Sequence, residues 1–303
     1  KSNAVAIIYD YSVLAGTQGY FHHQKLDRII EKAKKFNLPV VIYTEGGGGR
    51  PGDVDVTTQV AGLHVPSFAN WASLSGQSLK IAVNNGYCFA GNAALFGSSD
   101  FKIATKNSWI GMAGPAMIEG GGLGKFSPEE IGPIEEHKFN GVVDIVAEDE
   151  KEATFYAKKI LSYFQGSFED YKNNEQEILR EIMPKDRRYS YEVREILEII
   201  ADKESFLEVK KEYGKSVITG FIRIEGHPIA IIASNCKHIG GAIDSEASDK
   251  VSDFFNLCSD KMIPVASFVD TPGFMVGPES EKEGAVRRMA NLFKAGSMMK
   301  TPL

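Results

Sequence analysis

The chain follows the same strand–helix–strand plan twice, at positions about 225 residues apart. In each copy, an apolar run precedes a segment whose apolar residues recur at i, i+3, i+4 and i+7, the spacing of one face of an amphipathic helix. A second apolar run then closes on an acidic residue and a glycine turn. The paired segments are 4–8 with 229–233, 26–33 with 251–258, 38–43 with 263–268, and 45–48 with 270–273. The repeat predicts an α/β protein made of two related folds.

The sequence between the two copies predicts the domain organisation. Residues 165–188 are charged, poor in apolar residues and contain Pro184, as expected of a connector. After its acidic turn, the first copy continues through a strand at 79–83 and a glycine turn at 86–91. The second copy reaches Leu303 without such a turn, so we expect its domain to be truncated. The expected parts are a domain over 1–165, a charged helical connector over 166–216 and a truncated domain over 217–303.

Composition excludes several classes of partner. The net charge of −6 disfavours a nucleic-acid partner, which needs a basic face. No apolar run approaches the length of a membrane span. The three cysteines form no CxxC pair, which predicts reduced thiols in a cytoplasmic protein and excludes a zinc ribbon. The histidines show no metal-ligand spacing, so no metal site is expected.

The most specific local motif is the glycine-flanked segment 86–92, Gly-Tyr-Cys-Phe-Ala-Gly-Asn. Glycines between a strand and a helix of small residues can aim consecutive backbone N–H groups at one point. Such a turn forms a site for an anion or an oxyanion. It can equally be a tight packing turn between strand and helix, and the spacing alone does not separate these readings.

Other glycine-rich segments carry weaker signals. Residues 45–52 contain four consecutive glycines, which suggests either a phosphate-cradling loop or a flexible connector. In residues 120–125, Lys125 is followed by Phe126 where a P-loop has Ser or Thr, so nucleotide hydrolysis is rejected. The acidic residues between Glu119 and Glu136 are typical of a solvated face. The chain therefore offers backbone donors and few side-chain catalysts.

These motifs together resemble the carboxyltransferase component of biotin-dependent acyl-CoA carboxylases, a branch of the crotonase-like superfamily. The resemblance covers essentially the whole chain and is closest to the single-chain long-chain acyl-CoA carboxylase type. It implies tandem crotonase-like domains with a ββα superhelix. The segments that carry it are 9–19, 46–50, 86–91, 114–115, 149–153, 161–163, 220–226 and 268–274.

The resemblance also implies a mechanism. Carboxybiotin, brought by a biotin carboxyl carrier, releases CO₂, and the ureido anion removes the α-proton of an acyl-CoA. The resulting thioester enolate attacks CO₂. Two oxyanions develop, and one backbone N–H hole in each domain would stabilise them without a side-chain base. The implied partners are the carrier, a biotin carboxylase, in the same or a separate chain, and a further copy of this chain in a homodimer or larger homo-oligomer.

The resemblance assigns site residues by position. Ala90 and Gly91 match two glycines of the first-domain oxyanion hole. Alanine at position 90 departs from the family, but the implied donor is a backbone N–H. The second-domain hole would lie past Leu303. The implied CoA and substrate side comprises Gly47, Gly48, Arg50, Gly114 and Pro115, and the implied biotin side comprises Asp270, Thr271, Pro272, Gly273 and Phe274.

Several alternatives stay open at this point. A biotin-dependent acyl-CoA decarboxylase would use the same scaffold. A non-catalytic subunit that only holds the carrier would also fit. A hydratase would need a pair of glutamates that faces residues 90–91, and no glutamate pair has the sequence spacing to do so. A crotonase-fold peptidase would need a serine where this chain has Ala90. Acyl chain length is not readable from the sequence.

Overall fold

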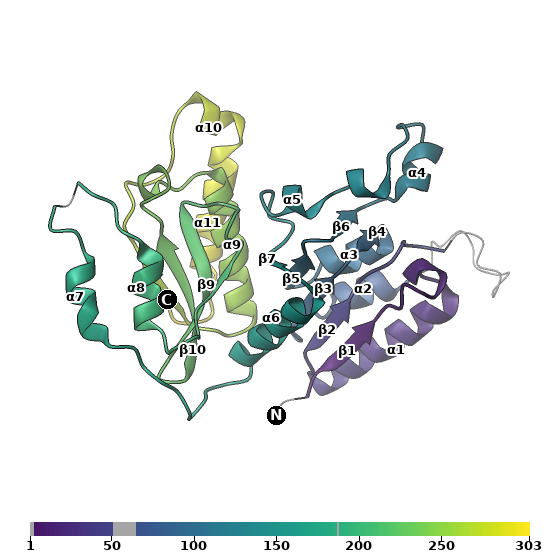
Figure 1. The fold of residues 1–303 in the computed structure, drawn as a ribbon, viewed down its shortest axis with the longest axis horizontal. Coiled ribbons are helices and arrows are strands. Elements are labelled where there is room, and N and C mark those ends of the chain that lie inside the picture. Colours follow the sequence, from purple (N-terminus) through teal and green to yellow (C-terminus); the bar gives the residue numbers. More distant parts are fainter. Residues whose placement is uncertain (1–2, 51–64, 187) are drawn as a thin grey trace. The chain divides into compact units, whose positions relative to one another are not determined.

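A computed structural model describes residues 3–50, 65–186 and 188–303 of the chain. These residues form two compact units, Lys1–Leu161 and Ser162–Leu303, and Figure 1 shows the elements of each. The part of the predicted glycine loop beyond Arg50 lies outside the described residues. Within the described residues, no helix has both the length and the apolar character that a membrane crossing needs.

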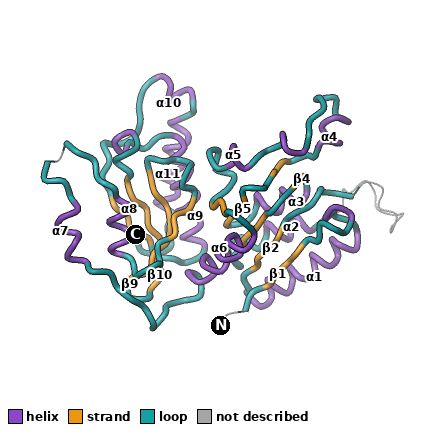
Figure 2. Tube along the Cα trace, viewed as in Figure 1, coloured by secondary structure: helices purple, strands orange, loops and turns teal. Residues whose placement is uncertain are grey.

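The first unit is built on a parallel five-stranded sheet with the order β1-β2-β3-β5-β7; Figure 2 draws the strands in orange. A second, two-stranded parallel sheet joins β4 to β6. The strands are β1 (Val5–Ile8), β2 (Val40–Tyr43), β3 (Lys80–Asn84), β4 (Tyr87–Phe89), β5 (Phe101–Thr105), β6 (Trp109–Gly111) and β7 (Ile145–Ala147). The helices are α1 (Tyr20–Phe36), α2 (Ser67–Ala72), α3 (Gly91–Gly97), α4 (Pro115–Gly120), α5 (Ile134–His137) and α6 (Glu150–Tyr163), with 3₁₀ turns η1 (Leu14–Gly16) and η2 (Pro128–Glu130).

The core of the first unit explains why these helices pack as they do. Leu26, Ile30 and Ala33 are the buried residues of α1, and they follow the predicted helical spacing. Trp71 of α2 is fully buried, and its indole N–H donates to the Leu95 carbonyl of α3. This bond satisfies a polar group inside the core and fixes α3 against α2.

The second unit contains a mixed four-stranded sheet with the order β11-β10-β9-β8. β9 pairs antiparallel with both β8 and β10, while β11 pairs parallel with β10. The strands are β8 (Leu207–Val209), β9 (Val217–Ile224), β10 (His227–Ser234) and β11 (Val265–Phe268). The helices are α7 (Leu179–Ile182), α8 (Val193–Ile200), α9 (Ser245–Asp260), α10 (Pro278–Lys282) and α11 (Ala285–Ser297), with 3₁₀ turns η3 (Gln176–Ile178) and η4 (Ile239–Gly241).

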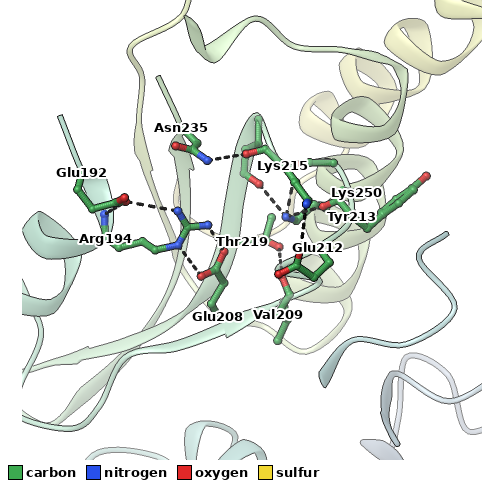
Figure 3. A network of polar contacts seen from close by, with 12 residues as sticks. Glu192, Arg194, Glu208, Val209, Glu212, Tyr213, Lys215, Thr219, Asn235 and Lys250 are labelled. Atoms are coloured by element: carbon green, nitrogen blue, oxygen red, sulfur yellow. Dashed lines mark hydrogen bonds and ion pairs between the residues drawn. The ribbon is translucent and has the colours of Figure 1, made fainter. Parts of the chain in front are cut away.

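Much of the segment predicted to be a connector, 166–216, belongs to the body of the second unit. Val193 and Leu197 of α8 pack in one core cluster with strands β9 and β10. Arg194 of α8 donates two hydrogen bonds of 2.8 Å to the Glu208 carboxylate on β8. Figure 3 shows the Arg194 guanidinium between Glu192 and Glu208. The predicted domain boundaries remain a prediction.

The same strand pairing occurs in both units, at residue numbers that differ by a constant offset. Val5 pairs with Val40 across β1 and β2, and Ala230 pairs with Val265 across β10 and β11. Turns η1 and η4 occupy corresponding positions, and each has a residue with positive φ at its centre (Ala15, 53°; Gly240, 64°). Gly16 and Gly241 follow, and a Cβ on either would collide with the carbonyl of the acid that follows the second strand, Glu45 or Asp270. Both copies of the predicted plan are therefore present.

Buried lysines stabilise turns in both units. The Lys250 ammonium on α9 donates to the carbonyls of Tyr213 (2.9 Å) and Val217 (2.7 Å), and Figure 3 shows it directed at this turn. Burial lowers its pKa to about 7. Lys80 on β3 is also fully buried and donates to the Ser98 carbonyl at the end of α3 (2.8 Å). Each buried ammonium thus donates to backbone carbonyls.

Candidate active site

The first residues of α3 form the centre of the candidate site. Ala90 immediately precedes the helix with φ 52° and ψ −117°, a conformation that favours glycine. Its N–H donates to the Gly111 carbonyl at 2.9 Å. The only backbone donor of Ala90 thus already has an acceptor in this arrangement, and its role as an oxyanion donor stays a prediction.

Gly91 differs from Ala90 in this respect. In the part of the chain that the structure describes, its N–H faces no hydrogen-bond acceptor. A Cβ at Gly91 would lie 2.3 Å from Gln18 Oε1 and 3.0 Å from the ring of Phe68. Gln18 is buried, and its amide N–H donates to the Tyr9 hydroxyl at 3.1 Å. Gly91 is thus closely enclosed on its Cα side while its N–H remains available.

Three of the six residues of the predicted turn 86–91 form strand β4. β4 pairs with β6, and its register places Cys88 opposite Ile110 and Phe89 opposite Gly111. Cys88 is fully buried, and burial raises the pKa of its thiol to about 12. A nucleophilic role for this thiol is not supported, because the thiolate is strongly disfavoured.

The Gly46–Arg50 loop is ordered by backbone hydrogen bonds to both sides. The Gly46 N–H donates to the Tyr87 carbonyl (2.7 Å), and the Gly47 N–H donates to the Ala15 carbonyl (2.9 Å). The Arg50 N–H donates to the Gln18 carbonyl (2.8 Å). These bonds exclude a flexible connector over 46–50. They also leave few N–H groups for a phosphate, so the loop is not a cradle of backbone amides.

The loop still presents groups to solvent. Gly47 and Gly49 are exposed, whereas Gly46 and Gly48 are buried. The Arg50 guanidinium is half-buried and donates to the Thr17 carbonyl (3.1 Å) and to Thr17 Oγ1 (3.2 Å). Of the residues predicted for the CoA side, Gly47 and Arg50 are accessible, whereas Gly48 is buried.

Asn92 is a residue whose importance the sequence did not reveal. Its side chain is fully buried at the second position of α3. Asn92 Oδ1 accepts from the Gly48 N–H at 3.0 Å, and Nδ2 donates to the Thr44 carbonyl at 3.1 Å. A longer bond of 3.5 Å reaches the Gly16 carbonyl. One side chain thus joins α3 to the loop and to turn η1.

Gly114 and Pro115 lie where β6 leads into α4. Gly114 immediately precedes α4, and a Cβ on it would meet the Phe89 ring at 3.4 Å. Phe89 in turn directly precedes Ala90. The structure therefore brings Gly114 to the residues that flank the start of α3, within the first unit.

The acidic residues near the site have structural partners. Glu129 accepts a short hydrogen bond from the Tyr87 hydroxyl, which lowers the pKa of the carboxyl. Glu135 pairs with Lys138, and Glu119 pairs with Lys125 (2.7 Å). The described residues contain no group of three His, Cys, Asp or Glu side chains arranged to hold a metal ion.

The second unit carries the predicted biotin-side residues on one loop. Asp270 accepts a hydrogen bond from the Tyr191 hydroxyl at 2.9 Å, and its N–H donates to Ser234 Oγ at 3.0 Å. The Phe274 ring packs edge-on against Phe293 of α11 at 5.5 Å. Asp270 and Pro272 are exposed, while Thr271, Gly273 and Phe274 are half-buried. The contacts of Asp270 and Phe274 fix the two ends of the loop, and the residues between them are exposed or half-buried.

Comparison with known proteins gives a single family. The model of the carboxyl transferase domain matches residues 3–303. The methylmalonyl-CoA carboxyltransferase 12S subunit of Propionibacterium freudenreichii subsp. shermanii is 31% identical, over 97% of this chain and 57% of its own length. The methylmalonyl-CoA decarboxylase subunit alpha of Veillonella parvula is 29% identical, over 98% of this chain and 60% of its own length.

A solved structure extends the similarity to three dimensions. The chain is similar to a single-chain, multi-domain long-chain acyl-CoA carboxylase, with a TM-score of 0.95 and 49% sequence identity. The match covers 99% of this chain and 30% of that chain. The chain spans a little over half the length of the two curated relatives.

Proposed function

The chain belongs to the carboxyl transferase domain family, and we propose that it transfers CO₂ between carboxybiotin and the α-carbon of an acyl-CoA. The predicted family resemblance and the α/β, crotonase-like fold class are confirmed. The direction of the reaction, the substrate and the partners of the whole protein are parts of the proposal.

The observation that carries the proposal is the Gly91 N–H, which faces no acceptor in the described residues. Removing a proton next to a thioester creates an enolate whose negative charge resides on oxygen. A fixed N–H donor stabilises such charge most where it is already oriented before the reaction. Gly91 begins α3, so the positive end of the helix dipole adds to the effect.

Neighbouring residues of the first unit would bind and orient the substrate. The Arg50 guanidinium and exposed Gly47 are the groups that we assign to the CoA side, since a cation suits the CoA phosphates. Gly114 and Pro115 would border the acyl group, because Gly114 lies against Phe89 beside the start of α3. Gly48 packs against Ala90 and so supports the start of α3.

We assign the biotin side to Asp270–Phe274. Biotin, delivered on a carrier, supplies CO₂ and a basic ureido group. One Asp270 carboxylate oxygen accepts from Tyr191, so the carboxylate can still accept an N–H of a ureido ring. Exposed Pro272 and half-buried Phe274 provide apolar surface for the rest of the ring system. The chemistry of the loop fits the group.

The relatives support the proposed substrate and direction. The 49% identity to a long-chain acyl-CoA carboxylase favours a long acyl chain and carboxylation. The similarity to a methylmalonyl-CoA decarboxylase subunit keeps decarboxylation as the second candidate. Both reactions pass through the same enolate, so the first-unit geometry serves either one.

The proposal includes assembly and location. We propose a biotin carboxyl carrier and a biotin carboxylase as partners, and a homodimer or larger homo-oligomer. The free, buried thiols of Cys88 and Cys258 agree with a cytoplasmic location. The domain boundaries at 165 and 217 are likewise retained as part of the proposal.

One assay tests the central claim. The intact enzyme would receive carboxybiotin and acyl-CoAs of increasing chain length, and the carboxylated products would be measured by mass spectrometry. We expect turnover that rises toward long chains. A protein that binds the carrier but carboxylates or decarboxylates no acyl-CoA would instead be a non-catalytic carrier-binding subunit.

A further inference from the structure

The Asn92 side chain connects the start of α3 to the Gly46–Arg50 loop, and we call its hydrogen bonds to Gly48, Thr44 and Gly16 the Asn92 clasp. All three partners are backbone groups, at 3.0, 3.1 and 3.5 Å. The side chain has no solvent exposure, so these bonds have no competition from water. A fully satisfied buried amide of this kind specifies one arrangement of the groups around it.

The second copy of the repeat shows that such a loop does not need a clasp from outside. The N–H that corresponds to Gly48 is that of Gly273, and it donates to Thr271 Oγ1 within its own loop at 3.1 Å. The backbone hydrogen bonds that close the loop are the same in both copies. Gln18 N–H donates to the Gly48 carbonyl at 2.7 Å, and Ile243 N–H donates to the Gly273 carbonyl at 2.9 Å.

The residue that satisfies this N–H in the second copy is absent from the first. Thr271 corresponds to Gly46, which has no side chain. A Cβ at Gly46 would lie 2.3 Å from Asn92 Nδ2 and 2.4 Å from the Gly16 carbonyl oxygen. Glycine at position 46 therefore makes room for the Asn92 amide. The Gly273 N–H thus donates to a residue of its own loop, whereas the Gly48 N–H donates to a side chain of α3.

We infer that Asn92 is a positioning residue that couples the Gly46–Arg50 loop to the Gly91 N–H. Asn92 directly follows Gly91 in the chain, so a shift of the clasp moves the peptide that carries this N–H. CoA bound at Arg50 and an oxyanion bound at Gly91 would then favour the same loop position. The inference rests on the proposed function, because it assigns those two ligands to these two elements.

The first test replaces Asn92 in the intact enzyme by an isosteric residue. Asn92→Asp keeps an acceptor for the Gly48 N–H but removes the donor to Thr44 and Gly16. We expect KM for acyl-CoA to rise and kcat to fall, with kcat/KM lower by about a hundredfold, as for a reacting geometry displaced by an ångström. KM for free biotin should not change. Asn92→Ser, which is smaller, gives the same readout if the Asp variant does not fold.

Asn174→Asp is the matched control. Asn174 Nδ2 donates to the carbonyls of Glu198 (2.8 Å) and Ala201 (3.0 Å) at the end of α8, so this change also removes a donor from two carbonyls. It should leave all kinetic constants unchanged. A lower melting temperature of Asn92→Asp with wild-type kcat and KM would overturn the inference, since it would show a purely structural role.

A double-mutant cycle tests the coupling itself. Arg50→Met introduces the residue of the corresponding position in the repeat, Met275. If the clasp couples loop and helix, Arg50→Met should reduce kcat/KM less in the Asn92→Asp background than in the wild type. If Arg50→Met reduced kcat/KM by the same factor in both backgrounds, the coupling would be overturned. A wild-type enzyme inactive with every acyl-CoA would instead refute the proposed function.

Discussion

Two adjacent residues, Ala90 and Gly91, have different tasks at the start of α3. The Ala90 N–H pairs with the Gly111 carbonyl and so continues the register of β4 and β6. Its φ of 52° is unusual for a residue with a side chain. The Gly91 N–H has no such partner among the described residues. The strained residue directs the chain out of the strand, and the next one presents the donor.

Replacing Gly91 tests the donor directly. Gly91→Pro and Gly91→Ala both add a Cβ against Gln18 Oε1, but only proline removes the N–H. Proline is tolerated at the first position of a helix. We expect Gly91→Pro to lose roughly 3–4 kcal/mol of transition-state stabilisation in kcat/KM measurements. Gly91→Ala should lose much less; equal losses would point to packing alone.

Replacing Ala90 tests the strain. Ala90→Gly removes a Cβ from a backbone conformation that costs a non-glycine residue about 1 kcal/mol or more. The greater freedom of glycine in the unfolded chain offsets part of this gain. We expect a variant at least as stable as the wild type in thermal unfolding. Ala94→Gly, inside α3, should be destabilised by about 1 kcal/mol. Equal destabilisation of both variants would contradict a strained Ala90.

At the scale of elements, the glycine loop contains a buried and an exposed glycine side by side. Gly48 has φ 88°, and a Cβ on it would lie 2.6 Å from the Ala90 methyl group; Gly49 has open space. We expect Gly48→Ala to lower the free energy of unfolding by about 2 kcal/mol or more and to reduce activity. Gly49→Ala should have little effect on either. Similar behaviour of the two variants would show that the loop has other conformations.

Helix α1 contributes a pH-sensitive contact. The His22 ring lies tilted against the Tyr9 ring with centroids 4.6 Å apart, and His22 Nδ1 is buried without a partner in the described residues. Burial, followed by the charges of His23 and Arg50, lowers the pKa of His22 from 6.5 to about 4. The unfolded chain therefore takes up the proton first as pH falls below 6.5. Stability should decrease between about pH 6.5 and pH 4.

His22→Phe checks this pH dependence while keeping an aromatic ring beside Tyr9. Because the imidazole is partly accessible to water, the loss for the wild type should be only about 1–2 kcal/mol across that window. The variant should lose less when unfolding is followed by urea titration at each pH. Parallel curves for the two proteins would exclude His22 as the titrating group.

The elements that the sequence predicted well are those with a local signal. Helical spacing and apolar runs located α1, β2, α9 and β11, because burial of one face fixes their pattern. The local sequence predicts a turn in place of strand β4, since the pairing of β4 with β6 depends on residues more than twenty positions away. Asn92 was passed over for the same reason. Its partners lie 44, 48 and 76 positions earlier, and no local pattern reports such contacts.

At the scale of the molecule, the repeat places equivalent loops in the two units. Gly47–Arg50 and Pro272–Met275 have the same backbone frame, closed by hydrogen bonds to Gln18 and to Ile243. Their chemistry differs, because Arg50 is cationic and Met275 is apolar. One frame thus carries a cationic side chain in the first unit and an apolar one in the second. We expect one active site to need one loop of each kind.

If each site combines the first unit of one chain with the second unit of its partner, inactive variants should complement each other. Gly91→Pro impairs only the first-unit half and Asp270→Ala only the second-unit half. Dissociating and reassembling an equal mixture would make half of all dimers hybrid, each with one intact site. Activity should recover to about a quarter of the wild-type value. Sites formed within single chains would recover none, because every chain carries one defect. A fully active monomer would likewise refute shared sites.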